Sequence, residues 1–478
     1  MSLMVDIVMF GWPLVVWGLL ASLPTRRAVI AAYILGVLFL PAGAEAVYKI
    51  RGLPDYSRIS ATSLILLPSV LLLDSGTVLR LRPRPIDLFM LLYCLTPLAS
   101  SLSNGLGWYD AISQMRGETV MWGVPYLMGR LYLTTAAAHR ELAIGVLLGA
   151  LAYVPLCLIE IRLSPQLNTW IYGYAQHMFA QTMRFGGYRP VVFMEHGLAV
   201  GLFMAAACLI AVWLWATGAV RSLLGAPILV LAPVLLGTFV LCKSLGALAE
   251  CMVATGLLFA ARWLRMRTIL LLMAVFPLLY VADRVVGLGV AEAIEQTAAM
   301  VQQERADSLR FRLDNETALI AKAMEQPLLG WGGWGRGRVH DEEGRDLSVT
   351  DGLWIIVFGN QGLIGLVGLL GFQLLPAVAL IRRVRAGGLG AAEAAAPLAL
   401  AMCLLMFSVD ALLNAPTNAV FMLMAGGLVS LSGSARPRRR PAPRREQEPL
   451  HWRVRRMASK DEGQDEGPRS DEPMTLPG

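Results

Sequence analysis

Apolar runs separated by short polar turns follow one another along most of the chain. A membrane-spanning helix needs roughly 20 mostly apolar residues. Thirteen runs approach this length: 7–23, 28–43, 60–74, 87–103, 117–135, 142–161, 190–216, 222–241, 245–261, 268–283, 352–381, 392–413 and 416–432. The pattern predicts an all-α polytopic membrane protein, a bundle of 12 or 13 transmembrane helices.

The composition agrees with a chain for which the bilayer is the solvent. Of the 478 residues 56% are hydrophobic and only 16% are charged, and the mean hydropathy is +0.58, whereas about a quarter of the residues of a soluble protein are charged. The run 7–23 has no basic segment before it and no clear cleavage site, which favours a first span over a cleavable signal peptide. The six cysteines lack metal-binding spacing, so we expect them to be packing residues.

Basic residues fall on alternate turns between the predicted spans. They are Arg26, Arg27, Arg80, Arg82, Arg84, Arg140, Arg221, Arg262, Arg265, Arg267, Arg382, Arg383, Arg385 and the arginines of the C-terminal tail. Because Lys and Arg mark cytoplasmic loops, this side is predicted to face the cytoplasm. The opposite side then receives every loop large enough to build a site.

Four regions follow one another: transmembrane helices with short loops (1–283), a large periplasmic loop (284–351), the last three transmembrane helices (352–433) and a tail (434–478). The tail is first basic and then acidic, with too few apolar residues for a core, so we predict a disordered cytoplasmic tail that contacts membrane lipids. Nine arginines between Arg436 and Arg456 account for the net charge of +7. We therefore expect no nucleic-acid partner.

The first candidate site on the outer side is the segment 183–197, where a loop enters the seventh predicted span. Arg184, Arg189 and a pair of glycines precede the ionisable pair Glu195-His196. Guanidinium groups bind phosphate bidentately, and ionisable residues within a membrane face interiors or cavities because exposing them to lipid is costly. The segment favours a phosphate-binding mouth over arginines that only mark the membrane interface.

The second candidate is the turn 242–250 between two spans. Its Lys243 lies on the outer side, against the trend of the basic residues, and small neighbours allow close helix approach. A lysine that only reaches for the membrane interface explains this position equally well.

The third candidate is the long loop 284–351. Residues 293–326 have helical periodicity and predict an amphipathic helix that lies on the bundle. Its apolar stripe consists of Leu309, Leu313, Ile320 and Met324. Pro327 and a glycine-rich turn end this helix, and His340 and Asp351 follow before the eleventh span.

Three short motifs carry a resemblance to a known family. The chain resembles the O-antigen ligase and O-antigen polymerase superfamily in the arginine-bearing loop 184–197, in the turn 327–332 and in Asp351-Gly352 followed after nine residues by Gly362-x-x-Gly365. The family's last motif begins with His-Asn, which Asp351-Gly352 replaces here. Together with the number of spans and the place of the large loop, the resemblance extends to about residue 432.

The resemblance implies a glycosyltransferase with a GT-C-like fold that needs neither metal nor cofactor. It would lie in a bacterial inner membrane with its active face in the periplasm. Its donor would be a glycan carried on undecaprenyl pyrophosphate, and its acceptor either lipid A–core in a ligase or another lipid-linked repeat in a polymerase. Because ligases typically carry histidine at the place of Asp351, an O-antigen or exopolysaccharide polymerase is at least as well supported as a ligase.

The implied reaction assigns roles to the charged residues. Breaking the sugar–phosphate bond develops negative charge on the departing pyrophosphate, which fixed cations stabilise. The expected pyrophosphate ligands are Arg184, Arg189 and Lys243. The acceptor hydroxyl needs a base within hydrogen-bond reach. The candidates for this base are Asp351, His340, His196 and Glu195.

Two other classes of protein stay open. A transporter or flippase for a lipid-linked or anionic substrate also uses buried cations, but it predicts charges near the bilayer midplane and discontinuous helices in paired halves. A non-catalytic scaffold of a polysaccharide export machinery has no use for the intramembrane pair Glu195-His196. The polar groups at one mouth and the long loop favour the glycosyltransferase.

Overall fold

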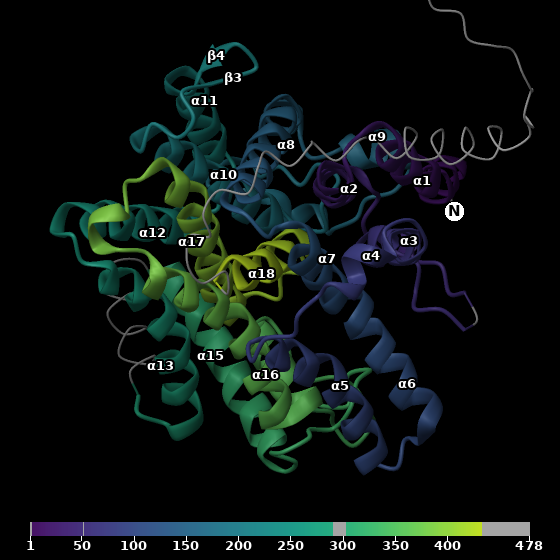
Figure 1. The fold of residues 1–478 in the computed structure, drawn as a ribbon. Coiled ribbons are helices and arrows are strands. Elements are labelled where there is room, and N and C mark those ends of the chain that lie inside the picture. Colours follow the sequence, from purple (N-terminus) through teal and green to yellow (C-terminus); the bar gives the residue numbers. More distant parts are fainter. Residues whose placement is uncertain (1, 51, 290–302, 433–478) are drawn as a thin grey trace, which may run out of the picture.

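The computed structural model describes residues 2–50, 52–289 and 303–432, and within them the protein is a bundle of helices (Figure 1). The α-helices are α1 (Leu3–Ser22), α2 (Thr25–Phe39), α3 (Arg58–Leu73), α4 (Ser75–Leu79), α5 (Asp87–Ser103), α6 (Gly107–Glu118), α7 (Val124–Tyr132), α8 (Ala136–Leu163), α9 (Leu167–Tyr172), α10 (Gly197–Ala216), α11 (Ile228–Leu241), α12 (Leu245–Leu264), α13 (Leu272–Val286), α15 (Gln303–Met324), α16 (Leu353–Arg383), α17 (Ala392–Leu413) and α18 (Ala419–Ser432). Single turns form η1 (Ala44–Ala46), η2 (Thr119–Gly123), η3 (Phe179–Thr182), η4 (Arg267–Leu271) and η5 (Ala386–Gly388). Two hairpins pair β1 (Met183–Arg184) with β2 (Gly187–Tyr188), and β3 (Ser222–Leu223) with β4 (Ala226–Pro227).

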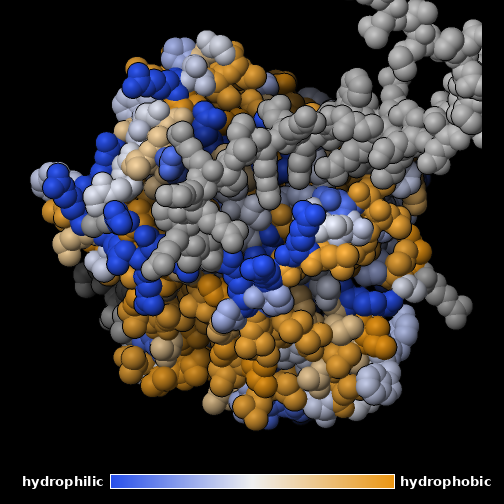
Figure 2. Space-filling model, viewed as in Figure 1, coloured by the Kyte–Doolittle hydropathy of each residue, from blue (hydrophilic) through white to orange (hydrophobic). Residues whose placement is uncertain are grey.

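Seven described helices are long and apolar enough to cross a membrane: α1, α8, α10, α12, the continuous segment Arg267–Val286, α16 and α17. Helices α3, α5, α11 and α18 are shorter and also apolar. Figure 2 shows hydrophobic side chains covering the face over α5, α13 and α16, where Leu91 and Leu279 are exposed. An exposed apolar surface of this extent is typical of contact with lipid. The all-α membrane fold is confirmed, while the count of 12 or 13 spans stays a prediction.

Two predicted spans begin later than expected. Residues 190–196 are irregular, and α10 begins only at Gly197. We call residues 190–196 the strap. Similarly, residues 222–227 hold the hairpin of β3 and β4, and α11 begins at Ile228. Hydropathy assigned both segments to helices because it measures apolarity and not backbone conformation.

Several arginine-bearing turns meet at one end of the bundle, which we call the basic end. Arg130 of α7 donates to both carboxylate oxygens of Asp87 of α5, at 2.8 and 2.9 Å, and to Ser430 of α18 at 2.6 Å. Arg84 donates to the carbonyl of Val429 at 3.0 Å. A bidentate arginine–carboxylate pair has fixed geometry, so these contacts tie α5, α7 and α18 together.

Helix α16 is interrupted at Gly362, whose φ of 63° and ψ of −163° are not helical. The turn 327–332 fills the interruption. Two amides of this turn donate to the carbonyls of Gly359 and Asn360, both at 2.9 Å, and the amide of Leu363 donates back to the turn at 2.8 Å. Protein groups therefore satisfy the backbone that the interruption frees, as a membrane requires.

Helix α15 lies against α13 and α16 through a buried polar contact. The carboxylate of Glu316 accepts hydrogen bonds from Tyr280 (2.9 Å) and Arg284 (3.1 Å) of α13 and from Trp354 (3.3 Å) of α16. Breaking such a buried ion pair by removing one partner costs about 3–5 kcal/mol. The contact therefore holds α15 on the bundle.

The amphipathic helix expected over 293–326 is described over Gln303–Met324, and residues 290–302 and the Leu309 side chain lie outside the described part. Leu313 is buried, as expected. Met324 is 52% exposed, and the predicted stripe was wrong there, because the helix turns Leu319 and Ala323 into the core instead.

The interruption of α16 provides the first test of the fold. A Cβ on Gly362 would overlap the carbonyl of Leu328 and would force a positive φ on an alanine. We expect Gly362→Ala to lower the free energy of unfolding by roughly 1–3 kcal/mol, measured by thermal unfolding in detergent. Gly256→Ala in α12 is the control, since nothing lies within 4 Å of a Cβ there. Equal stability of the two variants would contradict the close packing of Gly362 against Leu328.

Candidate functional site

The strap lies between the end of α8 and the start of α10, and Glu160 of α8 holds its backbone. One carboxylate oxygen of Glu160 accepts hydrogen bonds from the amides of Val191 and Val192, both at 2.8 Å, and the other accepts from Leu167 at 3.0 Å. The hydroxyl of Tyr153 accepts a further bond from the strap at 3.3 Å. Buried amides without partners are costly, so these acceptors allow an irregular segment to sit inside the bundle.

Arg189 precedes the strap and is 4% exposed. Its Nη2 donates to Ser244 Oγ at 3.0 Å. The aliphatic part of its side chain packs on Gly197, because a Cβ added to that glycine would lie 2.7 Å from Arg189 Cδ. Burial, with a smaller effect from the charge of Arg184, lowers the pKa of Arg189 to about 10, so the side chain stays cationic at neutral pH. Its Nε is buried without a hydrogen-bond partner.

Arg184 and Lys243 meet at the β1–β2 hairpin. Lys243 Nζ donates to the carbonyls of Arg184 (2.8 Å) and Phe185 (3.3 Å), across the turn that joins the strands. A lysine ammonium has three donors, so two of them stabilise the turn. Lys243 therefore lies beside Arg184, and two of its three N–H groups are already bound to the hairpin.

His196 ends the strap and caps α10. Its Nδ1 accepts a hydrogen bond from the amide of Leu198 at 3.0 Å. Burial, followed by the nearby charges of His177, Arg189, Arg184 and Arg312, lowers the pKa of His196 to about 3. The charges of three arginines, from the hairpin, the strap entry and α15, therefore act on this neutral imidazole, whose ring packs against His177 at a centroid distance of 4.3 Å.

Arg312 of α15 joins this cluster to Asp351. Its Nε lies 3.4 Å from Asp351 Oδ2, and its Nη1 donates to the carbonyl of Leu413 at 3.3 Å. The amide of Leu353 donates to the carbonyl of Asn414 at 2.9 Å. The last turn of α17 is thus the support on which Arg312 and Asp351 meet.

Asp410 lies in the same turn of α17 and is 5% exposed. It accepts a hydrogen bond from Asn414 Nδ2 at 2.7 Å, and the charges of Arg312 and Arg189 act on it. A carboxylate on which two arginines act offsets part of their mutual repulsion. We call Arg184, Arg189, His196, Arg312, Asp351 and Asp410 the arginine cluster.

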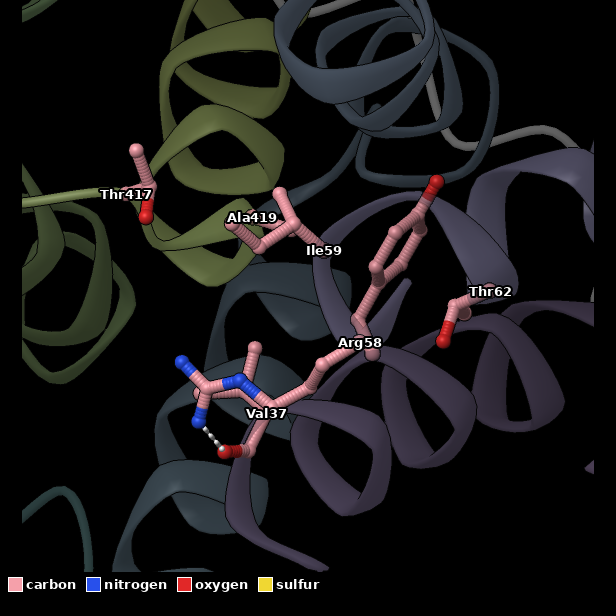
Figure 3. Close-up of a pocket in the computed structure, with 7 residues that line it drawn as sticks. Val37, Arg58, Ile59, Thr62, Thr417 and Ala419 are labelled. Atoms are coloured by element: carbon pink, nitrogen blue, oxygen red, sulfur yellow. Dashed lines mark hydrogen bonds between the residues drawn. The ribbon is translucent and has the colours of Figure 1, made fainter. Parts of the chain in front are cut away.

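Glu195 faces away from this cluster. It forms an ion pair with Arg58 of α3 and accepts a bond from Thr417 Oγ1 at 3.5 Å. Arg58 is buried and also donates to the carbonyl of Val37 at 3.0 Å. Arg58 and Thr417 line a small pocket between α2, α3 and the start of α18, where the guanidinium lies beside Val37 (Figure 3).

His340 is exposed in the loop that follows the turn 327–332. Its backbone pairs with that of Asp346 in a single bridge, and no described contact joins it to the arginine cluster. Of the predicted site residues, Arg184 meets Lys243 at the hairpin, the charges of Arg184 and Arg189 act on His196, and Asp351 is linked to them only through Arg312.

Sequence reasoning missed four residues of this region. They are Arg58, Glu160, Arg312 as a site residue, and Asp410. Arg58, Glu160 and Asp410 are ionisable residues within or beside apolar runs, a signal of a functional or structural role. Within the described part of the chain, no group of three or more His, Cys, Asp or Glu side chains is arranged to hold a metal ion.

No family model matches this chain, and neither does any curated protein. The fold alone defines the class: an all-α polytopic membrane protein with a charged cluster at one end of its bundle.

The acceptor role of Glu160 gives a second test. In Glu160→Gln one oxygen becomes an NH₂ group, which cannot accept and faces backbone donors. We expect the free energy of unfolding to fall by about 1–3 kcal/mol, measured by thermal unfolding in detergent. The control is Glu393→Gln, an exposed carboxylate at the start of α17. A Glu160→Gln variant that is as stable as the wild type would argue against Glu160 as the support of the strap.

His196 predicts a pH dependence. Its pKa of about 3 in the folded protein lies below the value of 6.5 for the free side chain, so the neutral ring contributes stability that is fully present above about pH 6.5 and is lost as pH falls towards 3. His196→Asn keeps a good N-cap without a titrating group. We expect the wild type to lose stability relative to this variant between pH 7 and 4.5, measured by thermal unfolding. A constant difference would show that His196 is not held neutral.

Proposed function

We propose that the protein is a membrane glycosyltransferase of the O-antigen ligase or polymerase type, which acts on a glycan linked to undecaprenyl pyrophosphate at the periplasmic face. The observation that carries this proposal is the placement of three arginines near the strap: Arg189 is buried against Ser244, Arg184 is joined through its carbonyl to the neighbouring Lys243, and Arg312 meets Asp351 at the end of α17. These arginines come from a hairpin, the entry to the strap and a separate helix. The fold therefore brings them to this region, and they are not a basic stretch of consecutive residues.

The cluster suits an anion of more than one charge. Each guanidinium offers paired donors that match phosphate oxygens, and a buried site strengthens electrostatic contacts because water is excluded. Asp351 and Asp410 reduce the net charge, so the empty cluster stays stable. A departing pyrophosphate gains charge in the transition state, and fixed cations would stabilise it more than the intact donor.

His196 fits a donor role at this cluster. Because Nδ1 accepts from Leu198, the neutral ring carries its proton on Nε2. An Nε2–H group near three arginines adds one more hydrogen-bond donor for phosphate oxygens. The ligand set that we propose for the pyrophosphate is Arg184, Arg189, Arg312 and His196, with Lys243 at the hairpin.

The site lies at helix ends, which favours transfer at a membrane surface over transport through the bilayer. Arg189 and His196 precede α10, Asp351 precedes α16, and Asp410 lies in the last turn of α17. A transporter places such groups at discontinuous helices near the midplane. The discontinuity of α16 is filled by the turn 327–332 and leaves its carbonyls bonded to protein.

Arg189→Ala tests the proposal in cells. Removing one donor to a developing oxyanion lowers turnover by about 100- to 1,000-fold, so surface glycan should be almost absent in a deletion strain complemented with this variant. Accumulated lipid-linked single repeats would indicate a polymerase, and finished polymer on its lipid a ligase. Arg345→Ala is the matched control, because Arg345 is an exposed loop residue paired with Asp341.

Unchanged surface glycans in the deletion strain itself would overturn the proposal. The amount of folded Arg189→Ala protein in the membrane must match that of the control, so that a loss of product reports on the site.

A further inference from the structure

The segment between α4 and α5, at the basic end of the bundle, is rich in arginine and has a fixed course. Arg82 and Arg84 alternate in it with two prolines, which restrict the backbone. The carbonyl of Arg82 accepts a hydrogen bond from Arg130 at 2.7 Å, and Arg84 Nη1 donates to the carbonyl of Val429 at 3.0 Å. The positions of these arginines are therefore set by α7 and α18.

The end of α16 lies beside this segment, because α16 packs closely on α5. A Cβ on Gly368 would lie 2.8 Å from the backbone nitrogen of Tyr93, and Gly371 packs on the ring of Phe89. The residue number rises along α16 as it falls along α5, so the two helices run antiparallel. The start of α5 and the end of α16 are therefore at the same corner of the bundle.

Arginines from both elements meet at this corner. Arg382 and Arg383 end α16, and the charge of Arg383 acts on Arg84. We call Arg80, Arg82, Arg84, Arg382 and Arg383 the corner arginines. Arg84 is half-buried and the other four are exposed.

Little negative charge balances the corner arginines. Asp87 is the nearby carboxylate, and both of its oxygens are already bound by Arg130, with a further bond from Tyr126 at 2.6 Å. Among the residues that the structure describes, no carboxylate forms an ion pair with a corner arginine. Because like charges repel, an anion bound here would stabilise the corner.

Exposed leucines lie on both sides of the corner arginines along the chain. Leu72 and Leu79 precede them, and Leu88, Leu91 and Leu95 follow on one face of α5. Figure 2 shows hydrophilic residues along the border of the hydrophobic face over this helix. A free anion has no contact to make with such a face, whereas a phospholipid carries both a phosphate and acyl chains.

We propose that the corner arginines bind the phosphate of an anionic phospholipid whose acyl chains lie along the exposed leucines of α5. Guanidinium groups match phosphate oxygens with paired donors, and basic pockets between membrane helices bind anionic lipid head groups. This site is separate from the arginine cluster at the strap and does not depend on the proposed glycosyl transfer.

Titration of the purified full chain in detergent with dioleoyl phosphatidylglycerol, followed by native mass spectrometry, tests this site. Arg82→Gln/Arg383→Gln removes two exposed charges and keeps the contacts of Arg84. Each arginine near a membrane surface contributes about 1 kcal/mol to the binding of anionic lipid, so we expect the Kd of the first bound lipid to rise about 30-fold. Dioleoyl phosphatidylcholine, which has no net charge, should bind the wild type more weakly than phosphatidylglycerol does.

Arg221→Gln/Arg265→Gln is the matched control, because it removes two exposed arginines that follow α10 and α12. Its Kd should equal that of the wild type. Equal weakening in the two double variants, or an unchanged Kd in Arg82→Gln/Arg383→Gln, would refute the site and assign lipid binding to the basic surface as a whole or to the C-terminal tail. Binding of glycerol 3-phosphate as tight as that of phosphatidylglycerol would also refute it, since the leucines of α5 would then contribute nothing.

Discussion

Backbone hydrogen bonding inside a membrane is the constraint on which the arrangement of this protein depends. Lipid offers no partner for an amide or a carbonyl, so a non-helical segment persists only where protein groups satisfy it. The strap meets this condition through the carboxylate of Glu160, and the interruption of α16 meets it through the turn 327–332. Of the two, the strap belongs to the charged cluster, because it carries His196 to the start of α10.

Three separate supports hold the charges of the cluster. Glu316 anchors α15, which carries Arg312 one turn earlier on the same helix. The strap carries His196, and the last turn of α17 receives the segment of Asp351. Repulsion between the arginines opposes their assembly, so the cluster persists only because tertiary packing imposes it. Such a cluster is a form of preorganisation, since its donors need no rearrangement when an anion binds.

The sequence predicted the fold class because membrane helices depend on a one-dimensional property, the length of an apolar run. It also singled out Arg184, Arg189 and the pair Glu195-His196, since ionisable residues next to apolar runs stand out. That signal places a residue at a site without identifying its partner. Arg58 and Glu195 are 137 positions apart and meet only through the packing of α2, α3 and the strap.

The errors in the helix boundaries have a similar cause. The strap is as apolar as a helix, and only the acceptor supplied by Glu160 makes its irregular course possible. In α15, the position of Met324 at the surface follows from the angle at which the helix docks on α13 and α16, which helical periodicity alone does not define. The glycines of 327–332 and 362–365 resembled a family signature, and their close approach in the bundle gives that pattern a packing reason as well.

The most direct test of this account is a structure of the full chain in lipid nanodiscs with undecaprenyl pyrophosphate bound. The account predicts density for the two phosphate groups within hydrogen-bond distance of the guanidinium groups of Arg189 and Arg312, on the side of the strap that His196 faces. Density for these two phosphate groups at the basic end of the bundle, or on the Glu195 side of the strap, would contradict it.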